Sequence, residues 1–139
     1  MTLNRCYAVV LTIGMFLLPG AAFASYPSSV VGTWSAYGNN SAMTLTISSQ
    51  DTVGPCYVIA GTIGAVVGPF QTITGFYCKA TGRISFLRLD PTTNETYQVY
   101  TGNLSLASTG LAEEIGGTMS VYNAAGTPGE YNFSAEKTS

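Results

Sequence analysis

The stretch Val30-Val31-Gly32-Thr33-Trp34 decides how this chain is expected to fold. Two β-branched residues lead into Gly-Thr-Trp, a pattern typical of a strand whose large ring faces the inside of a sheet. The glycine before the ring indicates a backbone that packs closely against a neighbour. Because the chain has a single tryptophan, we expect Trp34 to anchor a core, with contact to a ligand as the alternative.

Before this stretch, residues 1–24 have the features of a secretory signal peptide. A short cationic segment ends at Arg5, an almost unbroken apolar run reaches Leu18, and Ala22-Phe23-Ala24 fits the cleavage rule. A membrane anchor needs about 20 consecutive apolar residues, so the sequence predicts cleavage and no anchor. The mature chain, residues 25–139, is expected to be one secreted or periplasmic domain.

The charge of the expected mature chain argues against two kinds of partner. Arg5 leaves with the leader, so four basic residues remain against seven acidic ones, a net charge of −3. No basic patch is present to bind a nucleic-acid backbone, and no Lys/Arg cluster favours an anionic membrane surface. We therefore expect neither nucleic acid nor a membrane as a partner.

Two cysteines, Cys56 and Cys78, remain after removal of the leader. An even number in an exported protein indicates a disulfide. Gly68-Pro69 separates two strand-like runs, and a hairpin here pairs positions whose numbers sum to 134. That register places Tyr57 opposite Tyr77 and the two cysteines opposite each other. Reduced thiols or a metal pair are the alternatives, although a metal needs more ligands and the chain has no histidine.

The remainder of the chain repeats short alternating runs separated by Gly and Pro. Connections are short, so neighbouring runs are expected to pair antiparallel. The sequence predicts an all-β fold, an eight-stranded antiparallel up-and-down β-barrel whose interior is packed or holds one small ligand. A β-sandwich is the alternative. The expected strands are 30–37, 41–49, 55–65, 70–79, 83–90, 95–107, 114–122 and 130–137.

Catalytic chemistry finds little support in the residue types. Without histidine, no Ser-His-Asp or Cys-His arrangement can form. Glu113 and Glu114 are adjacent on an expected strand and point to opposite faces, whereas glycosidase carboxylates converge across a cleft. No glycine-rich phosphate loop is present. We therefore expect no enzymatic activity and no cofactor.

In order and spacing, these motifs resemble the avidin/streptavidin family of biotin-binding β-barrels. The resemblance covers Val30 to Lys137. Lipocalins also begin with Gly-x-Trp, but they are usually longer and carry a C-terminal helix that this sequence does not predict. The matching segments are Gly32-Thr33-Trp34, Tyr57, Ile73-Thr74-Gly75-Phe76-Tyr77, Tyr100-Thr101-Gly102 and Ile115-Gly-Gly-Thr-Met-Ser-Val121.

The resemblance implies that biotin binds non-covalently at one end of the barrel, as a ligand and not as a cofactor. It implies that Tyr57, with Asn40 or Ser41, holds the ureido oxygen. Thr96 and Gln98 match the positions near the valerate tail and the ring sulfur. The ligand-binding set implied in this way is Asn40, Ser41, Tyr57, Ile59, Phe86, Leu87, Thr96, Gln98, Tyr100, Met119 and Val121.

Several positions depart from the family pattern. Ile59 stands where the family has a serine, and Phe86 or Leu87, Tyr100 and Met119 stand where it has tryptophans. The aspartate near the end of the last strand and the tryptophan donated by a neighbouring subunit have no counterpart. Each lost ring costs on the order of 1–3 kcal/mol, and each ~1.4 kcal/mol weakens binding tenfold. We therefore expect a weakened biotin site.

Three functions remain open at this point. The first is an exported barrel for a small, partly apolar ligand, with biotin or a biotin-like molecule foremost. The second is an envelope protein that uses the barrel as a stable module, and the third is a general lipophile carrier. We also expect a homo-oligomer through the exterior of the last three strands, including Val99 and Tyr122. A dimer is favoured over a tetramer, because the shared tryptophan is absent.

Overall fold

The computed structural model describes residues 25–105, 113–122 and 127–139. The expected signal peptide and the last two residues of the expected strand 95–107 lie outside these ranges. The described part contains no helix long and apolar enough to cross a membrane. Its strands are β1 (Gly32–Gly38), β2 (Ser41–Gln50), β3 (Tyr57–Ala65), β4 (Gln71–Cys78), β5 (Arg83–Leu89), β6 (Thr96–Leu104), β7 (Glu114–Val121) and β8 (Gly129–Lys137).

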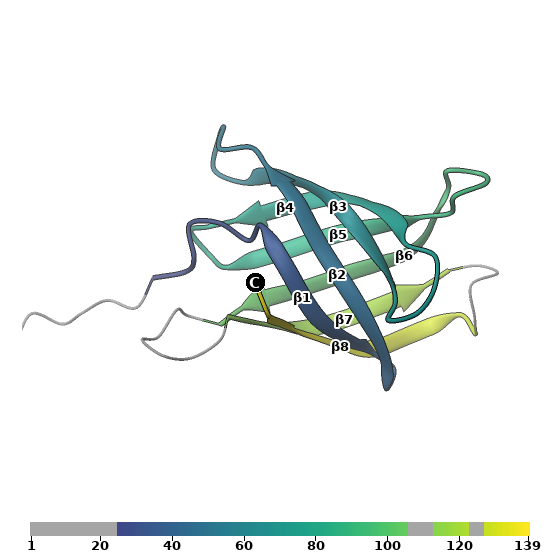
Figure 1. The fold of residues 1–139 in the computed structure, drawn as a ribbon. Coiled ribbons are helices and arrows are strands. Elements are labelled where there is room, and N and C mark those ends of the chain that lie inside the picture. The colour runs from purple at the N-terminus through teal and green to yellow at the C-terminus, as the bar shows by residue number, and fades with distance from the viewer. Residues whose placement is uncertain (1–24, 106–112, 123–126) are drawn as a thin grey trace, which may run out of the picture.

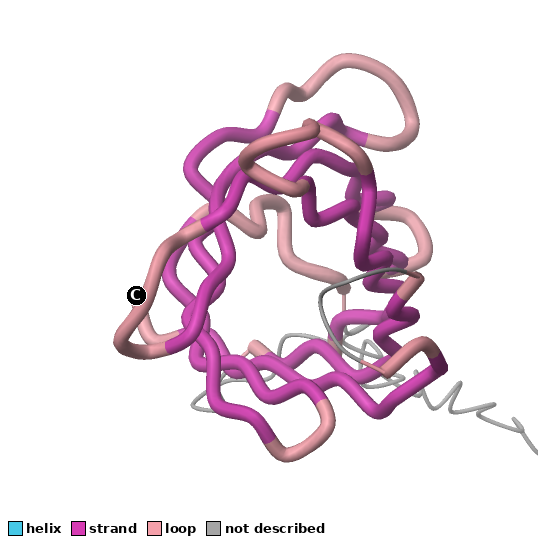
Figure 2. The backbone as a smooth tube through the Cα atoms, turned by 90° about the vertical axis from the view of Figure 1, so that its right-hand side faces the viewer, coloured by secondary structure: helices cyan, strands magenta, loops and turns pink. Residues whose placement is uncertain are grey.

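The eight strands close into a barrel in which each strand pairs antiparallel with its neighbour in sequence (Figure 1). β8 returns to β1, with Ala36 opposite Ala135, and this pairing completes the ring seen along the barrel in Figure 2. The predicted up-and-down barrel is confirmed, and the sandwich is excluded because no strand is left at an edge.

Alternation along the strands produces the core. On β1 and β2, Trp34, Leu45 and Ile47 point inward and are almost completely buried, whereas Ser35, the next residue after Trp34, is exposed. Each such apolar side chain contributes about 1.5–3 kcal/mol by leaving water. Trp34 is a core anchor, as the first interpretation predicted. The aromatic rings of Phe86, Tyr100 and Phe133 fill the middle of the barrel.

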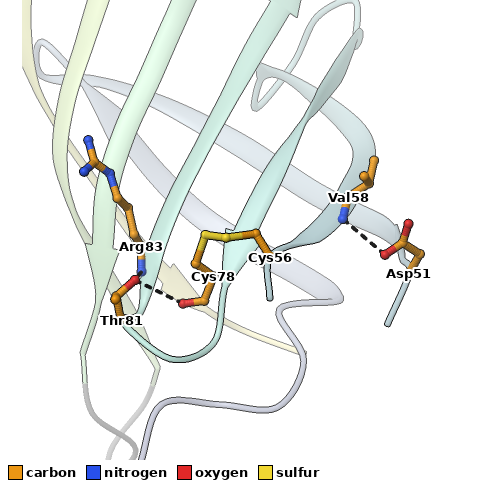
Figure 3. Close-up of a disulfide and its surroundings, with 6 residues drawn as sticks. All are labelled: Asp51, Cys56, Val58, Cys78, Thr81 and Arg83. Carbon is orange, nitrogen blue, oxygen red and sulfur yellow. Dashed lines mark hydrogen bonds between the residues drawn. A yellow bond between two sulfur atoms is a disulfide. The ribbon is translucent and has the colours of Figure 1, made fainter. Parts of the chain in front are cut away.

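The β3–β4 hairpin has the predicted register, with Tyr57 opposite Tyr77. One position further, Cys56 and Cys78 form a disulfide with a Cα–Cα distance of 4.0 Å, which confirms the predicted bond. Figure 3 shows it joining the start of β3 to the end of β4, beside the β4–β5 turn. Cys56 is exposed, whereas Tyr77 on the other face of the sheet is buried. The disulfide therefore lies on the exterior.

The two ends of the barrel are covered differently, and we name them by what they carry. At the disulfide end, residues 25–31 precede β1 and cross the opening of the barrel (Figure 1). The strand β1 begins at Gly32, two residues later than predicted. The Tyr77 hydroxyl donates to the Pro27 carbonyl at 2.6 Å, and the Trp34 indole N–H donates to the Val30 carbonyl at 3.1 Å. The opposite end, where β1 turns into β2 and β5 into β6, is the pocket end.

Candidate functional site

The β1–β2 turn forms one side of the pocket end. Asn39 and Asn40 both have left-handed backbone angles, with φ of 48° and 64°. Two such residues in succession form the hairpin turn that matches the twist of the strands, and asparagine tolerates this conformation better than most residues. The Asn39 N–H also donates to the carbonyl of Asn132 on β8 at 3.2 Å. The turn is thereby held over the pocket, with Ser41 at its rim.

A pocket of about 310 Å³ opens at this end of the barrel. Asn39, Ser41 and Thr127 supply polar groups around it, and Arg88 and Gln98 supply two more. The apolar part of its wall includes Met43, Ala65, Met119 and Val121. A small cavity with apolar walls and a few polar groups is the usual form of a small-ligand site.

Aromatic rings pack in the middle of the barrel, deeper than the pocket. Phe86 and Tyr100 are stacked with ring centroids 4.7 Å apart, and Phe133 meets Tyr100 edge-on at 4.9 Å. In the β5–β6 register the Phe86–Tyr100 pair lies one inward-facing position deeper than the Arg88–Gln98 pair. Packed rings of this kind stabilise the barrel beyond the area they bury.

A network of polar side chains lies directly above these rings. The Arg88 guanidinium donates from Nε to Gln71 Oε1 at 2.6 Å and from Nη1 to Gln98 Oε1 at 2.9 Å. Gln98 Oε1 also accepts from the Tyr100 hydroxyl at 2.7 Å, and Gln71 Oε1 accepts from the Tyr97 hydroxyl. Because arginine has only donors, the glutamine atoms that face it must be the carbonyl oxygens.

A β-bulge makes this network possible. Thr96 pairs with Leu89, whereas Gln98 pairs with Arg88, so Tyr97 is an extra residue on β6. A bulge of this kind re-aims a side chain. Tyr97 and Gln98 are consecutive, yet both are 7% exposed. The Tyr97 ring consequently lies beside Arg88, with the guanidinium carbon 5.2 Å from the ring centroid.

The two phenols of the network remain neutral at pH 7. Burial raises the pKa of Tyr97 and of Tyr100 above the usual value, although the positive charge of Arg88 opposes both shifts. Asp90 lies on the neighbouring turn, where its carboxylate accepts hydrogen bonds from the backbone N–H groups of Thr92 and Thr93 at 2.7 and 2.9 Å. These bonds lower the pKa of Asp90. Neither phenol supplies a negative charge to Arg88.

The structure brings part of the predicted ligand-binding set together. Ser41, Gln98, Met119 and Val121 line the pocket. Phe86 and Tyr100 do not line it but lie one inward-facing position deeper in the barrel. The sequence left Phe86 and Leu87 as alternatives for one position, and Phe86 is the inward-facing residue of the two. Leu87 is half-buried and lies on the outward-facing side of β5. These six residues come from four strands, β2, β5, β6 and β7.

Tyr57 and Ile59 do not belong to this group, which corrects the expectation that Tyr57 and the β1–β2 turn hold one ligand atom. β3 begins at the disulfide end with Tyr57 and reaches the pocket end only at Ala65, opposite Met43. At ~3.3 Å per residue, Tyr57 lies roughly 26 Å along the strand from Ala65. Tyr57 instead borders a separate hollow of about 480 Å³ with Tyr26 and Pro55.

Two more expectations need correction. Thr96 is exposed at the first position of β6, on the far side of the bulge from Gln98, and does not line the pocket. Asn40 is exposed at the tip of the turn, and its neighbours Asn39 and Ser41 line the pocket in its place. In each case the side chain is close in sequence to the site, but the local backbone directs it elsewhere.

Arg88 and Gln71 are the functional candidates that sequence reasoning missed. A signal for Arg88 was present, because Ile84, Phe86 and Arg88 alternate and share one face of β5. A charged residue in phase with two core residues at a strand end points into the barrel mouth. Gln71 gave no comparable signal, since its partner Tyr97 reaches it only through the bulge.

Within the described ranges, no group of three or more His, Cys, Asp or Glu side chains is placed to hold a metal ion. No protein-family model matches the chain, and a search of curated proteins finds no match. The barrel and its pocket are therefore the observations from which function is inferred.

Proposed function

We propose that this protein is an exported barrel that binds a small ligand non-covalently at its pocket end, with biotin or a biotin-like molecule as the ligand. The observation that carries the proposal is the pocket of about 310 Å³ in the mouth of an eight-stranded barrel. Barrels of eight strands have room for one small ligand, and their mouths are frequent binding sites.

The lining of the pocket fits a ligand with both polar and apolar parts. Asn39 and Ser41 offer hydrogen bonds at the rim, and Gln98 offers one deeper in the pocket. Met43 and Met119 supply flexible, polarizable walls that adapt to a ring system. Met119 provides less ring contact than the tryptophan implied by the family resemblance, so we expect a dissociation constant in the micromolar to millimolar range, roughly −8 to −4 kcal/mol.

The other two functions receive less support. A structural module needs no pocket, although the aromatic filling of the barrel middle is compatible with it. A general lipophile carrier needs an open apolar cavity, whereas this pocket contains Arg88 and Gln98. Desolvating such polar groups against a hydrocarbon chain is unfavourable.

Calorimetric titration of the purified protein with biotin tests the proposal. We expect measurable heat, a rise in melting temperature, and affinity reduced about fivefold to tenfold by Ser41→Ala, which removes a rim hydroxyl. Tyr57→Phe is the matched control, since it removes a hydroxyl at the opposite end and leaves affinity unchanged. Absence of both heat and a thermal shift at millimolar biotin would remove the proposal.

We propose in addition that the protein forms a homo-oligomer, most simply a dimer, through the exterior of β6–β8. Val99 is half-buried on this outer face and Tyr122 is 61% exposed, so apolar area is available for a contact. Light scattering measures the mass of the assembly in solution. The protein concentration should be roughly tens of micromolar, the order at which weak specific interfaces assemble. A mass equal to one chain would contradict the dimer.

A further inference from the structure

The charge of Arg88 has no carboxylate partner in this chain. All seven acidic residues lie in the described ranges. The one ion pair among them joins Lys137 and Glu113, at the disulfide end. Asp90, the nearest acid along the chain, accepts hydrogen bonds from its own turn. A half-buried guanidinium is usually matched by an anion, because partial removal of a charge from water is unfavourable.

The position of the guanidinium is nevertheless well defined. Gln71 holds Nε, Gln98 holds Nη1, and the Tyr97 ring lies against the planar group. Neither of these two hydrogen bonds uses Nη2. The strand alternation directs the side chain inward, and Arg88 lines the pocket. The geometry therefore presents an ordered cation to the cavity with donor capacity to spare.

The hydrogen-bonding character of the surrounding network favours an anion. The side-chain oxygens of Gln71 and Gln98 each accept two hydrogen bonds within the network, from Arg88 and from a phenol. The described part of the chain has no fully buried side-chain nitrogen or oxygen without a partner. Within the described residues, the Gln98 amide nitrogen takes no part in the network's hydrogen bonds. Gln98 lines the pocket, and we infer that its amide nitrogen is the atom available to a ligand there.

We propose that the pocket recognises a carboxylate through Arg88 and the Gln98 amide, and that its ligand is therefore a small organic anion. Arginine binds a planar carboxylate with two parallel hydrogen bonds, and its orientation here is set in advance by three side chains. The apolar walls from Met43, Met119 and Val121 then receive the rest of the molecule. The inference shares the pocket of the proposed function and specifies which end of the ligand is recognised.

Two pairs of probes test the inference, each pair consisting of a carboxylate and its neutral amide. The pairs are biotin with biotinamide and hexanoate with hexanamide, titrated by calorimetry. We expect each acid to bind about tenfold to hundredfold more tightly than its amide, as for a charge-assisted hydrogen bond. Arg88→Gln should abolish this preference. Arg83→Gln is the matched control, because Arg83 is exposed on the same strand at the other end and its loss should leave the preference intact.

A second measurement does not depend on the folding of a variant. In the wild-type protein, the NMR signals of the Arg88 side-chain N–H and the Gln98 amide should shift on titration with hexanoate and stay in place with hexanamide. Arg88→Lys, which keeps the charge but lacks the planar fork, should retain part of the preference.

The outcomes separate this inference from the proposed function. Equal binding of biotin and biotinamide would overturn carboxylate recognition and leave the biotin proposal standing. Arg88-dependent binding of hexanoate without any binding of biotin would support the anion site and overturn the biotin proposal. Failure of both acids to bind at millimolar concentration, with no NMR shift, would overturn both.

Discussion

The two ends of this barrel use buried polar side chains for different purposes. At the disulfide end, Tyr77 and Trp34 donate to backbone carbonyls of the segment that crosses the opening. At the pocket end, Arg88 and Gln98 bond to other side chains and border a cavity of about 310 Å³. Polar groups that bind the chain itself close one end, whereas polar groups that bind one another leave the other end able to receive a ligand.

The difference also concerns what each end contributes to stability. The disulfide end contains the sole tryptophan, the disulfide and the interactions of residues 25–31. The pocket end contains turns, a bulge and a charge without a counterion. Sites that bind ligands are often less stable than the scaffold that supports them. Substitutions at the disulfide end should therefore act mainly on unfolding, and those at the pocket end mainly on binding.

The largest effect is expected from Trp34→Ala. Truncation of a buried tryptophan leaves a cavity and costs about 3–5 kcal/mol of the free energy of unfolding, measured by urea denaturation. Tyr37→Ala on the same strand is the control, since Tyr37 is 52% exposed on the outer face and its loss should change stability by only about 0.5 kcal/mol. Similar losses in the two variants would contradict the assignment of faces on β1.

Removal of the disulfide should cause the next largest loss of stability. The bond joins residues separated by 22 positions, and the chain-entropy model gives about 3 kcal/mol for a loop of this length. The Cys56→Ala, Cys78→Ala double variant should lose that stability in urea denaturation and become insensitive to reductant. Its affinity for ligand should remain that of the wild type, and a large loss of affinity would show that the two ends are not independent.

A smaller effect is expected from Tyr77→Phe, which removes the hydrogen bond to Pro27 and about 1 kcal/mol of stability at pH 7. Burial, with a contribution from Glu113, raises the pKa of Tyr77 to about 12 from its usual 10. The folded state therefore favours the protonated phenol. This contribution is fully present below pH 10 and is lost as the pH rises toward 12. Denaturation at several alkaline pH values should show a smaller decline for Tyr77→Phe than for the wild type.

Asn40→Gly should have the smallest effect. Asn40 has φ of 64°, a conformation that glycine adopts without strain, so stability should change by only about 0.5 kcal/mol. Ligand affinity should also be unchanged, because Asn40 does not line the pocket. A loss of affinity as large as that expected for Ser41→Ala would mean that the asparagine contacts the ligand directly.

The candidate site was only partly predictable. Four of the residues for which the family resemblance implied ligand binding, Ser41, Gln98, Met119 and Val121, line the pocket. Tyr57 does not line the pocket. The order of the strands alone predicts this, because the whole length of β2 separates Tyr57 from the β1–β2 turn. Similarity of one residue in a short motif is a weaker constraint on position than the direction in which a strand runs.

Alternation and turn residues in the sequence by themselves determined the eight strands, their antiparallel order and the pairing of Cys56 with Cys78. These features depend on contacts between strands that are neighbours along the chain. For such strands, the two-residue alternation and the short loops leave few alternative pairings. Only the tertiary structure decided which side chains share an end of the barrel, and that Arg88, Gln71 and Tyr97 form one network. That arrangement depends on a one-residue bulge and on three different strands, and a single shifted residue changes which side chains face the interior.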